Sequence, residues 1–334
     1  MKKTLRKITV IYNLPIGASP DDLDTQKSAL GVAQGLGEAG YEVDTLGLTA
    51  ETISAVKKIK ADLVFNLVEW AGQDCRLGVK TIKYLELAGV PYTGSNGWGY
   101  QLSCDKKLMK QALQKHHLPT PKWQVFDSGD ELISPFKYPV IVKPTLEHSA
   151  IGISQKSVVT NSTDLKEQVN HLLEQFRQPV LAEEFIAGDE AQVTILEKLG
   201  HPWVLPPAVF RYRQQEGYWP INTYEAKWGE GWEAGMSDWV ELTDAGLLKR
   251  LEDLSRQCYI YLGGRSYPRV DLRIAPDGQV YILEVNNNPG IDFDSESGIT
   301  VSAKAVDLTW QTLLKNIVEE AFAMGTNTHD AAVL

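Results

Sequence analysis

Residues 269–290 contain the polar side chains of this sequence that are best placed to do chemistry, in a segment that predicts a β-hairpin. Apolar and charged residues alternate up to residue 274, a Pro-Asp-Gly turn follows, and residues 280–285 form a second β-rich run. If the connecting loop has an even number of residues, one face of the hairpin carries Arg269, Asp271, Glu284 and Asn286. Two carboxylates and an amide oxygen suit a hard cation such as Mg²⁺.

A solvated charged face is the simpler interpretation of such a hairpin. The turn-forming residues 286–290, Asn-Asn-Asn-Pro-Gly, favour a functional interpretation, because loops that leave a rigid sheet often carry binding and catalytic groups. The hairpin is therefore a candidate site for a divalent cation, which other segments of the chain must complete.

Composition limits what such a site can serve. The chain of 334 residues is long enough for two or three domains, and its net charge of −10 argues against nucleic acid as a partner. Three scattered cysteines predict neither a disulfide framework nor a zinc site and fit a reducing cytoplasm. We find no signal-peptide core and no apolar stretch long enough to cross a bilayer. We expect a cytoplasmic protein with no membrane partner.

Residues 1–95 alternate between strand and helix patterns, which predicts a doubly wound α/β domain. We expect strands at 8–12, 41–46, 63–68 and 90–95, and helices at 28–39, 50–60 and 78–88. Residues 35–40 match the dinucleotide pattern G-x-G-x-x-G, but they close a helix and precede a strand. A dinucleotide site requires the reverse order, so we reject a nicotinamide oxidoreductase.

The rest of the chain predicts two α+β units, 96–180 and 181–334. In the first we expect a helix at 105–116, strands at 122–126, 138–143 and 152–159, and a helix at 163–176 capped by Ser162 or Thr163. In the second we expect strands at 180–185 and 192–197, a polar loop at 211–238, a helix at 244–262, the hairpin, and a final helix at 301–323.

Two further motifs have both a structural and a functional interpretation. Lys143 ends an apolar strand, where it either extends into solvent or holds a nucleotide phosphate under the following loop. Glu183 and Glu190 lie on either side of another strand end, as a solvated edge or as acceptors for adenine and ribose. Neither motif decides the matter alone.

Taken in order, these segments resemble the ATP-grasp enzymes, and most closely the D-alanine–D-alanine ligases. The resemblance covers nearly the whole chain and is strongest at 89–95, 104–106, 143–144, 147–153, 183–190, 224–227 and 269–290. It implies an ATP-grasp fold, with an N-terminal α/β domain (1–95), a lid subdomain (96–180) and a catalytic subdomain (181–334) that clasp ATP. It also implies a homodimer.

The resemblance assigns roles in nucleotide and metal binding. ATP would be bound by Lys106, Lys143, Glu183, Glu184, Ile186, Glu190 and Lys227, with the lysines on the phosphates and with Glu183 and Glu190 on adenine and ribose. Two Mg²⁺ ions, for which Mn²⁺ can substitute, would be held by Asp271, Glu284 and Asn286.

It also assigns roles in the reaction. Arg269 would stabilise the oxyanion, with Ser149 and Lys227 as the other catalytic residues. Gly290 and Ser295 would bind the carboxylate of the second amino acid.

The sequence departs from the family pattern where the first substrate is bound. The family's Gly-Gly after the first strand is replaced by residues 13–17, and its His-Gly pair by Glu69-Trp70. The tyrosine after the lid lysine is Trp228, which cannot accept a hydrogen bond. Ser149 is retained, but Ala150 follows it. We therefore expect Glu69 and Trp228 to take part in a pocket for a different first substrate.

We predict an ADP-forming carboxylate–amine ligase that makes an amide bond through an acyl phosphate. The nucleophile would be an amino acid and the carboxylate substrate would not be D-alanine. The alternatives are a D-alanine–D-alanine ligase, a ligase that adds an amino acid to a mycosporine-type carboxylate, and a non-catalytic ATP-binding protein.

Overall fold

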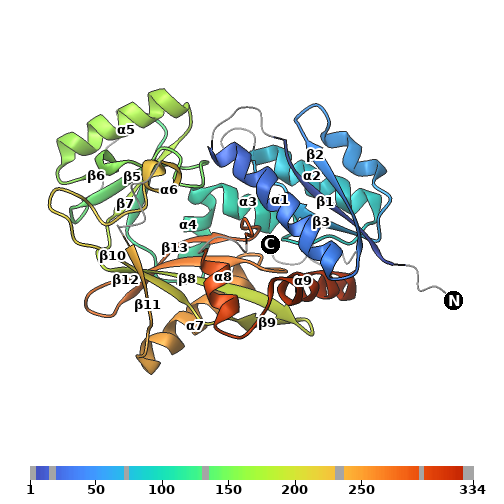
Figure 1. Ribbon diagram of the computed structural model, residues 1–334. Helices are drawn as coiled ribbons and strands as arrows, with labels where there is room; N and C mark the ends of the chain where they lie inside the picture. Colours follow the sequence, from blue (N-terminus) through green and yellow to red (C-terminus); the bar gives the residue numbers. More distant parts are fainter. Residues whose placement is uncertain are drawn as a thin grey trace.

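The computed structural model describes residues 5–14, 20–70, 75–129, 135–229, 237–292 and 297–325. Figure 1 shows three groups of strands and helices around a common centre: an N-terminal α/β group, a small sheet covered by α5, and a larger sheet between and below them. This arrangement confirms the predicted mixture of one α/β unit and two α+β units. Within the described ranges, no helix is both long and apolar enough to cross a membrane.

The N-terminal group is a parallel sheet with helices on both faces. Its strand order is β2–β1–β3, from β1 (Lys7–Asn13), β2 (Glu42–Leu48) and β3 (Leu63–Leu67). Ile8, Val10 and Tyr12 of β1 face α1 (Pro20–Glu38) and the C-terminal helix α9 (Trp310–Met324). Ile11 faces the opposite side, toward η1 (Ile53–Lys58) and α2 (Cys75–Ala88). Because both faces are covered, the inner strands β1 and β3 are almost continuously buried, whereas the edge strand β2 is not.

Three local predictions for this group can be compared with the structure. The rejected G-x-G-x-x-G segment ends α1, and its last residue, Gly40, has a φ of +93°, a left-handed conformation typical of the glycine after a helix. The predicted helix at 50–60 is only the short 3₁₀ segment η1. The predicted strand at 90–95 is a single bridge between Tyr92 and Val64.

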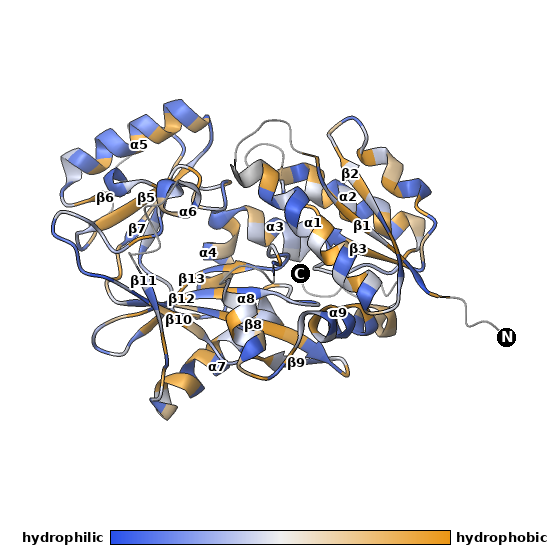
Figure 2. Cartoon of the chain, in the orientation of Figure 1, coloured by the Kyte–Doolittle hydropathy of each residue, from blue (hydrophilic) through white to orange (hydrophobic). Residues whose placement is uncertain are grey.

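The small sheet is antiparallel, in the order β4–β7–β5–β6. Its strands are β4 (Trp123–Phe126), β5 (Val140–Pro144), β6 (Val158–Val159) and β7 (Val180–Glu184). Helix α5 (Ser162–Phe176) covers it through Leu165, Val169 and Leu172 and is coloured in mixed blue and orange along its length (Figure 2). Its N-cap is Asn161, so the predicted caps Ser162 and Thr163 were wrong by one or two positions.

The predicted strand at 152–159 was also wrong. Only β6 pairs there, after the 3₁₀ segment η3 (Gln155–Ser157). The physical reason lies in the preceding residues, because Ser149, Ala150 and Gly152 all have φ between +54° and +77°. A left-handed backbone turns the chain and prevents an extended run.

The large sheet positions the hairpin. Its main path is β11–β10–β8–β12–β13, and β9 pairs with β8. The strands are β8 (Asp189–Lys198), β9 (His201–Val204), β10 (Ala208–Tyr212), β11 (Ser237–Val240), β12 (Arg269–Ile274) and β13 (Val280–Asn286). The helices α3 (Gly97–Cys104), α4 (Lys106–Lys115) and α7 (Ala245–Tyr261) share an apolar core with this sheet.

Two predictions for the last part of the chain need correction. The predicted polar loop at 211–238 includes the end of β10, the start of β11 and helix α6 (Tyr224–Trp228). The predicted final helix is two helices, α8 (Gly298–Lys304) and α9. Asp307 between them has a φ of +56°, and Thr309 caps α9 by accepting a hydrogen bond from the Thr312 amide.

Candidate active site

The hairpin brings its four polar residues to one face through a β-bulge. Arg269 pairs with Asn286 across the strands, and Asp271 pairs with Glu284. The connecting loop, residues 275–279, has an odd number of residues, so the loop alone would not give this pairing. The register shifts between Asp271 and Leu272, and this bulge turns Glu284 and Asn286 to the face that Asp271 occupies.

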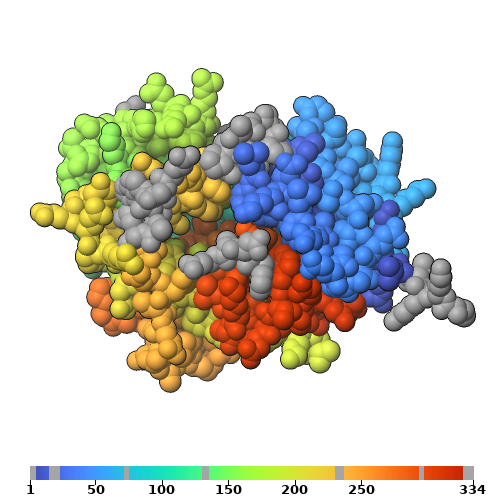
Figure 3. Space-filling model, in the orientation of Figure 1, coloured from blue at the N-terminus to red at the C-terminus, as the bar shows by residue number. Residues whose placement is uncertain are grey.

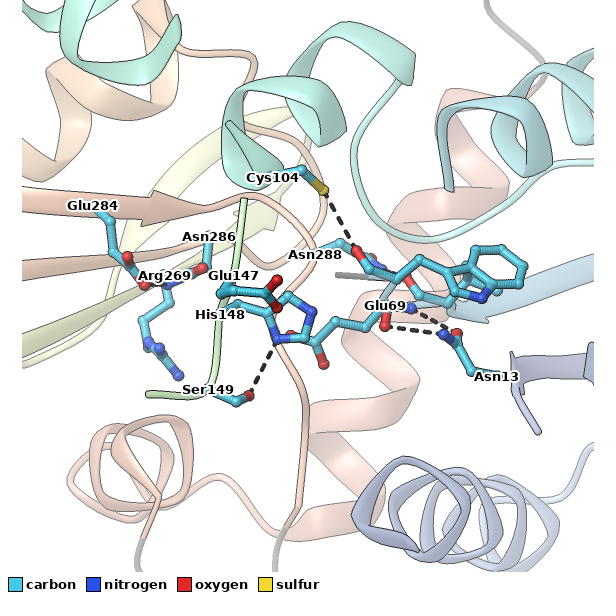
Figure 4. Close-up of polar contacts among 12 residues, drawn as sticks. Asn13, Glu69, Cys104, Glu147, His148, Ser149, Arg269, Glu284, Asn286 and Asn288 are labelled. Carbon is cyan, nitrogen blue, oxygen red and sulfur yellow. Dashed lines mark hydrogen bonds and ion pairs between the residues drawn. The ribbon is translucent and has the colours of Figure 1, made fainter. Parts of the chain in front are cut away.

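The side chains on this face are joined by short polar contacts. Arg269 makes a two-pronged ion pair with Asp271, with Nε–Oδ1 and Nη2–Oδ2 distances of 2.7 and 2.8 Å. Asn286 Nδ2 donates to Asp271 Oδ2 at 3.0 Å and to Glu284 Oε1 at 3.2 Å. The face is thus one connected network, with Asp271 at its centre. Figure 4 shows three of its members, Arg269, Glu284 and Asn286.

The donor set of this network fits a hard divalent cation. Burial alone would raise the pKa of Glu284, but attraction to Lys106 and Lys143 lowers it to about 2, so the group is ionised at neutral pH. Among the described residues, no three His, Cys, Asp or Glu side chains form a metal cluster. A cation here would therefore need Asn286 besides Asp271 and Glu284, and Arg269 would have to release part of Asp271 to it.

Three lysines from two elements, α4 and β5, surround Glu183 and Glu284. Lys106, at the start of α4, donates to the Glu147 carbonyl and lies 3.9 Å from Glu284 Oε2. Lys143 on β5 lies 2.5 Å from Glu183 Oε1, and Lys110 on α4 lies 2.7 Å from Glu183 Oε2. The Lys143 side chain is 12% exposed and that of Lys110 is 1% exposed, so Lys143 is the one that can meet a phosphate.

These contacts correct the interpretation of Glu183. Its side chain is 1% exposed and each carboxylate oxygen faces a lysine, so the carboxylate does not present itself to adenine. Attraction to Lys110 and Lys143 outweighs the effect of burial and lowers the pKa of Glu183 to about 2. Glu183 is a structural counter-ion that positions Lys143.

The other predicted nucleotide residues lie nearby on β7 and β8. Glu190 is buried against Tyr212, whose hydroxyl donates to it at 3.1 Å, and against Arg273 at 3.2 Å. Glu184 accepts a hydrogen bond from the Lys137 amide at 2.8 Å, and Ile186 is half-buried just beyond β7. Burial raises the pKa of Glu190, although attraction to the positive charge of Arg273 acts to lower it.

Helix α6 docks on the loop after β5. Trp228 Nε1 donates to the Ser149 carbonyl at 3.0 Å, and the Tyr224 amide donates to the Ile153 carbonyl at 3.0 Å. Lys227 Nζ lies 4.8 Å from the centre of the Trp228 ring. The indole thus acts as a donor, as its chemistry requires, and it joins the helix that carries Lys227 to the loop that carries Ser149.

Glu69 reaches the site from the N-terminal sheet. It follows β3, where His148 Nδ1 lies 3.5 Å from its Oε1 atom and 3.3 Å from Ser149 Oγ. Both of these contacts use the same ring nitrogen, so they do not form a proton relay from Ser149 through His148 to Glu69. A methyl group built on Gly290 would lie 3.9 Å from Glu69 Oε2. Figure 4 shows Glu69, His148 and Ser149 beside Arg269.

The site therefore lies where the three groups of the chain meet. In the space-filling view the surface is hollowed between the yellow, blue and red parts of the chain (Figure 3). Asn288 joins two of these parts, because its Nδ2 atom donates to the Val68 carbonyl at 3.1 Å. Asn287 donates to the carbonyls of Gly99 and Leu262 at 2.9 and 2.7 Å. The asparagine run thus holds the hairpin against the neighbouring elements.

Comparisons with known proteins identify this arrangement. The family model described as "D-ala D-ala ligase C-terminus" matches residues 112–319. The chain is 30% identical to the D-alanine–D-alanine ligase of Aquifex aeolicus, over 90% of this chain and 97% of that protein. The chain belongs to the D-alanine–D-alanine ligase family. Its members are ATP-grasp ligases that form carbon–nitrogen bonds, and this protein is one of them.

Two further relatives of this ligase agree. The D-alanine–D-alanine ligase of a Marinomonas species is 32% identical over 96% of this chain and 98% of that protein. The crystal structure of the Bacillus anthracis D-alanine–D-alanine ligase complexed with ATP covers 96% of this chain and 98% of its own, with a TM-score of 0.75 and 23% identity. This structural likeness establishes the ATP-grasp fold.

Sequence reasoning about this ligase missed several residues of the site. Lys110, His148 and Asn13 were not singled out, although each had a signal. Lys110 lies one helical turn after Lys106, on the face that also carries Met109 and Leu113. His148 lies between Glu147 and Ser149 in the loop after β5, and Asn13 ends β1. One predicted residue, Ser295, lies outside the described residues.

Proposed function

We propose that this ligase phosphorylates a carboxylate substrate with ATP and joins the acyl phosphate to an amino acid. The observation that carries the proposal is the hairpin network of Arg269, Asp271, Glu284 and Asn286, with Lys106 and Lys143 beside it. Pure nucleotide binding does not require an arginine beside the metal-type ligands. This set therefore favours catalysis over a binding-only role.

The residues of the chain divide the first step between them. Lys106 and Lys143 would hold the phosphates of ATP, and Glu190 and the residues near Ile186 would hold the nucleoside. The substrate carboxylate attacks the γ-phosphate, where positive side chains offset the crowded negative charge. Mg²⁺ held by Asp271, Glu284 and Asn286 would supply further charge neutralisation when bound.

The second step takes place beside Arg269. The amine attacks the carbonyl carbon of the acyl phosphate, and Arg269 faces the oxygen that becomes negative. Lys227 would reach the transferred phosphoryl group from α6. Because acyl phosphates react readily with water, the contact of Trp228 with the Ser149 carbonyl, which holds α6 on its loop, would help to exclude water.

We propose further that the carboxylate substrate is not D-alanine. The indole of Trp228 supports this, because it replaces a side chain that could accept a hydrogen bond and donates to the Ser149 carbonyl instead. The names of the relatives favour D-alanine instead. A mycosporine-type carboxylate, a homodimer and the use of Mn²⁺ also stay predictions.

A screen of ADP release tests these proposals. The protein is incubated with ATP, Mg²⁺, one candidate carboxylate and one amino acid, over a panel that includes D-alanine alone. Release that needs both a carboxylate and an amine supports the ligase, and robust turnover of D-alanine alone would make it a D-alanine–D-alanine ligase. ATP binding without ADP release from any pair would favour a binding protein.

A further inference from the structure

Asn13 fixes the backbone of Glu69 from both sides. Asn13 Nδ2 donates to the Glu69 carbonyl at 3.0 Å, and Asn13 Oδ1 accepts from the Glu69 amide at 2.9 Å (Figure 4). The two residues end β1 and follow β3, which are neighbours in the parallel sheet. Ligands of open α/β sheets bind at this edge, beyond the carboxyl ends of the strands. Asn13 therefore holds Glu69 in place where a ligand is expected.

The Glu69 carboxylate faces the reaction centre. Its Oε2 atom lies next to Gly290, and its Oε1 atom lies 3.5 Å from His148 Nδ1. Its charge, after those of Asp271 and Glu284, helps to raise the pKa of Arg269 against the opposing effect of burial. Burial lowers the pKa of Lys227, and the negative charge of Glu69 partly offsets this effect. Glu69 thus lies beside Gly290 and close enough to Arg269 and Lys227 for its charge to act on both.

We propose that Glu69 binds the ammonium group of the incoming amino acid and accepts its first proton. This inference rests on the proposed ligase function. An ammonium group has no lone pair, so it must lose a proton before its nitrogen can attack the acyl phosphate. A carboxylate beside Gly290, where the carboxylate of the amino acid is expected, attracts the ammonium group. The nearby positive charges of Arg269 and Lys227 favour release of the proton from that group.

The step balances without any further reactant. One proton passes from the ammonium nitrogen to Glu69, and the nitrogen lone pair forms the bond to the carbonyl carbon. The carbon–oxygen bond to phosphate breaks, and its electron pair leaves with phosphate, which takes the second proton of the nitrogen. Glu69 returns its proton to water after the product leaves. Glu69 is a catalytic residue in this scheme, and Asn13 is its positioning residue.

Hydroxylamine separates this role from the formation of the acyl phosphate. It is an uncharged nucleophile at neutral pH, so it traps an acyl phosphate as a hydroxamate without needing a base. We expect Glu69→Gln to lower kcat for amide formation about 100-fold or more with the amino acid panel of the ADP screen. Hydroxamate formation with hydroxylamine should stay within threefold of wild type. Glu69→Asp, which keeps a carboxylate, should recover part of the lost kcat.

Two further variants sharpen the test. Asn13→Ala should lower kcat for amide formation by a smaller factor and leave hydroxamate formation unchanged. Glu86→Gln is the matched control, because Glu86 lies in the same N-terminal group, accepts a hydrogen bond from the Tyr92 hydroxyl and takes no part in the site. Its two activities should equal those of wild type.

Three results would overturn the inference. The first is that Glu69→Gln forms the amide at a rate within threefold of wild type. The second is that the variant raises the KM for the amino acid without lowering kcat. The third is that it loses amide formation and hydroxamate formation to the same extent. Failure of the proposed function is a different result, in which wild-type protein forms neither ADP nor hydroxamate with any carboxylate of the panel.

Discussion

At the scale of single residues, buried charge distinguishes the nucleotide side of the site from the substrate side. Glu183 and Lys110 are almost fully buried and paired, and Lys143 completes the group. Glu69 and His148 are partly exposed, with 32% and 22% of their side chains accessible. Buried charges fix the position of Lys143, while the exposed pair is free to meet a substrate.

Because Glu183 is buried in its ionised form, the free energy of unfolding falls at acid pH. The pKa of Glu183 is about 2 in the fold, below its ordinary value of 4.5, so its contribution is present above about pH 4.5 and is lost as the pH falls toward 2. We expect Glu183→Gln to be less stable than wild type by about 3 kcal/mol at pH 7, with the difference shrinking below pH 4. Urea unfolding from pH 7 to pH 3 measures this, and a constant difference would contradict it.

The hairpin carboxylates predict a separable effect on activity. We expect Glu284→Ala to abolish ADP release while the thermal unfolding temperature changes little, because Glu284 lies on the open face of β13 with 25% of its side chain exposed. Glu252→Ala is the control, since Glu252 pairs with Arg256 on the exposed face of α7. If Glu284→Ala released ADP as fast as wild type, Glu284 would not be a ligand of a catalytic metal ion.

At the scale of elements, a side-chain hydrogen bond from Trp228 to the Ser149 carbonyl joins α6 to the loop after β5. We expect Trp228→Phe to raise the KM for ATP about fivefold, because it removes the donor to the Ser149 carbonyl, worth about 1 kcal/mol. Steady-state kinetics checks this, with Trp239→Phe on the exposed strand β11 as the control. An unchanged KM for ATP would mean that this hydrogen bond does not hold α6 on the loop that carries Ser149.

Elements with a clear period were predictable, and those set by tertiary contacts were not. The alternation in β12 predicted the hairpin, although the bulge that aligns Glu284 with Asp271 has no local sequence signal. The break between α8 and α9 depends on a left-handed Asp307, which helical spacing does not reveal. The resemblance assigned Glu183 to adenine, and its ion pair with Lys110 could not be foreseen because the two residues are distant in sequence.

At the scale of the whole molecule, the two ends of the chain share one core. Leu313, Leu314 and Ile317 of α9 pack with Val10 and Phe65 of the N-terminal sheet. Helices α3 and α4 pack with the large sheet, although the predicted boundaries place them with the small one. The boundaries at 95/96 and 180/181 stay a proposal, but the shared core predicts that the first and last segments unfold together.

This shared core gives a direct test of cooperativity. We expect Ile317→Ala to lower the free energy of unfolding by about 2–5 kcal/mol, because the side chain is 2% exposed and its removal leaves a cavity. Ile260→Ala, at a position that is 59% exposed, should change it by less than about 0.5 kcal/mol. Urea unfolding followed by circular dichroism and by tryptophan fluorescence should give one transition. Two separate midpoints would contradict a common core.

The central claim is that a carboxylate oxygen is transferred to phosphate during the reaction. The most direct measurement supplies ¹⁸O in the carboxylate of a substrate that supports ADP release and examines the phosphate by mass spectrometry. An acyl-phosphate ligase places one ¹⁸O atom in each phosphate released. Unlabelled phosphate would show that water or another group attacks ATP, and would contradict the account.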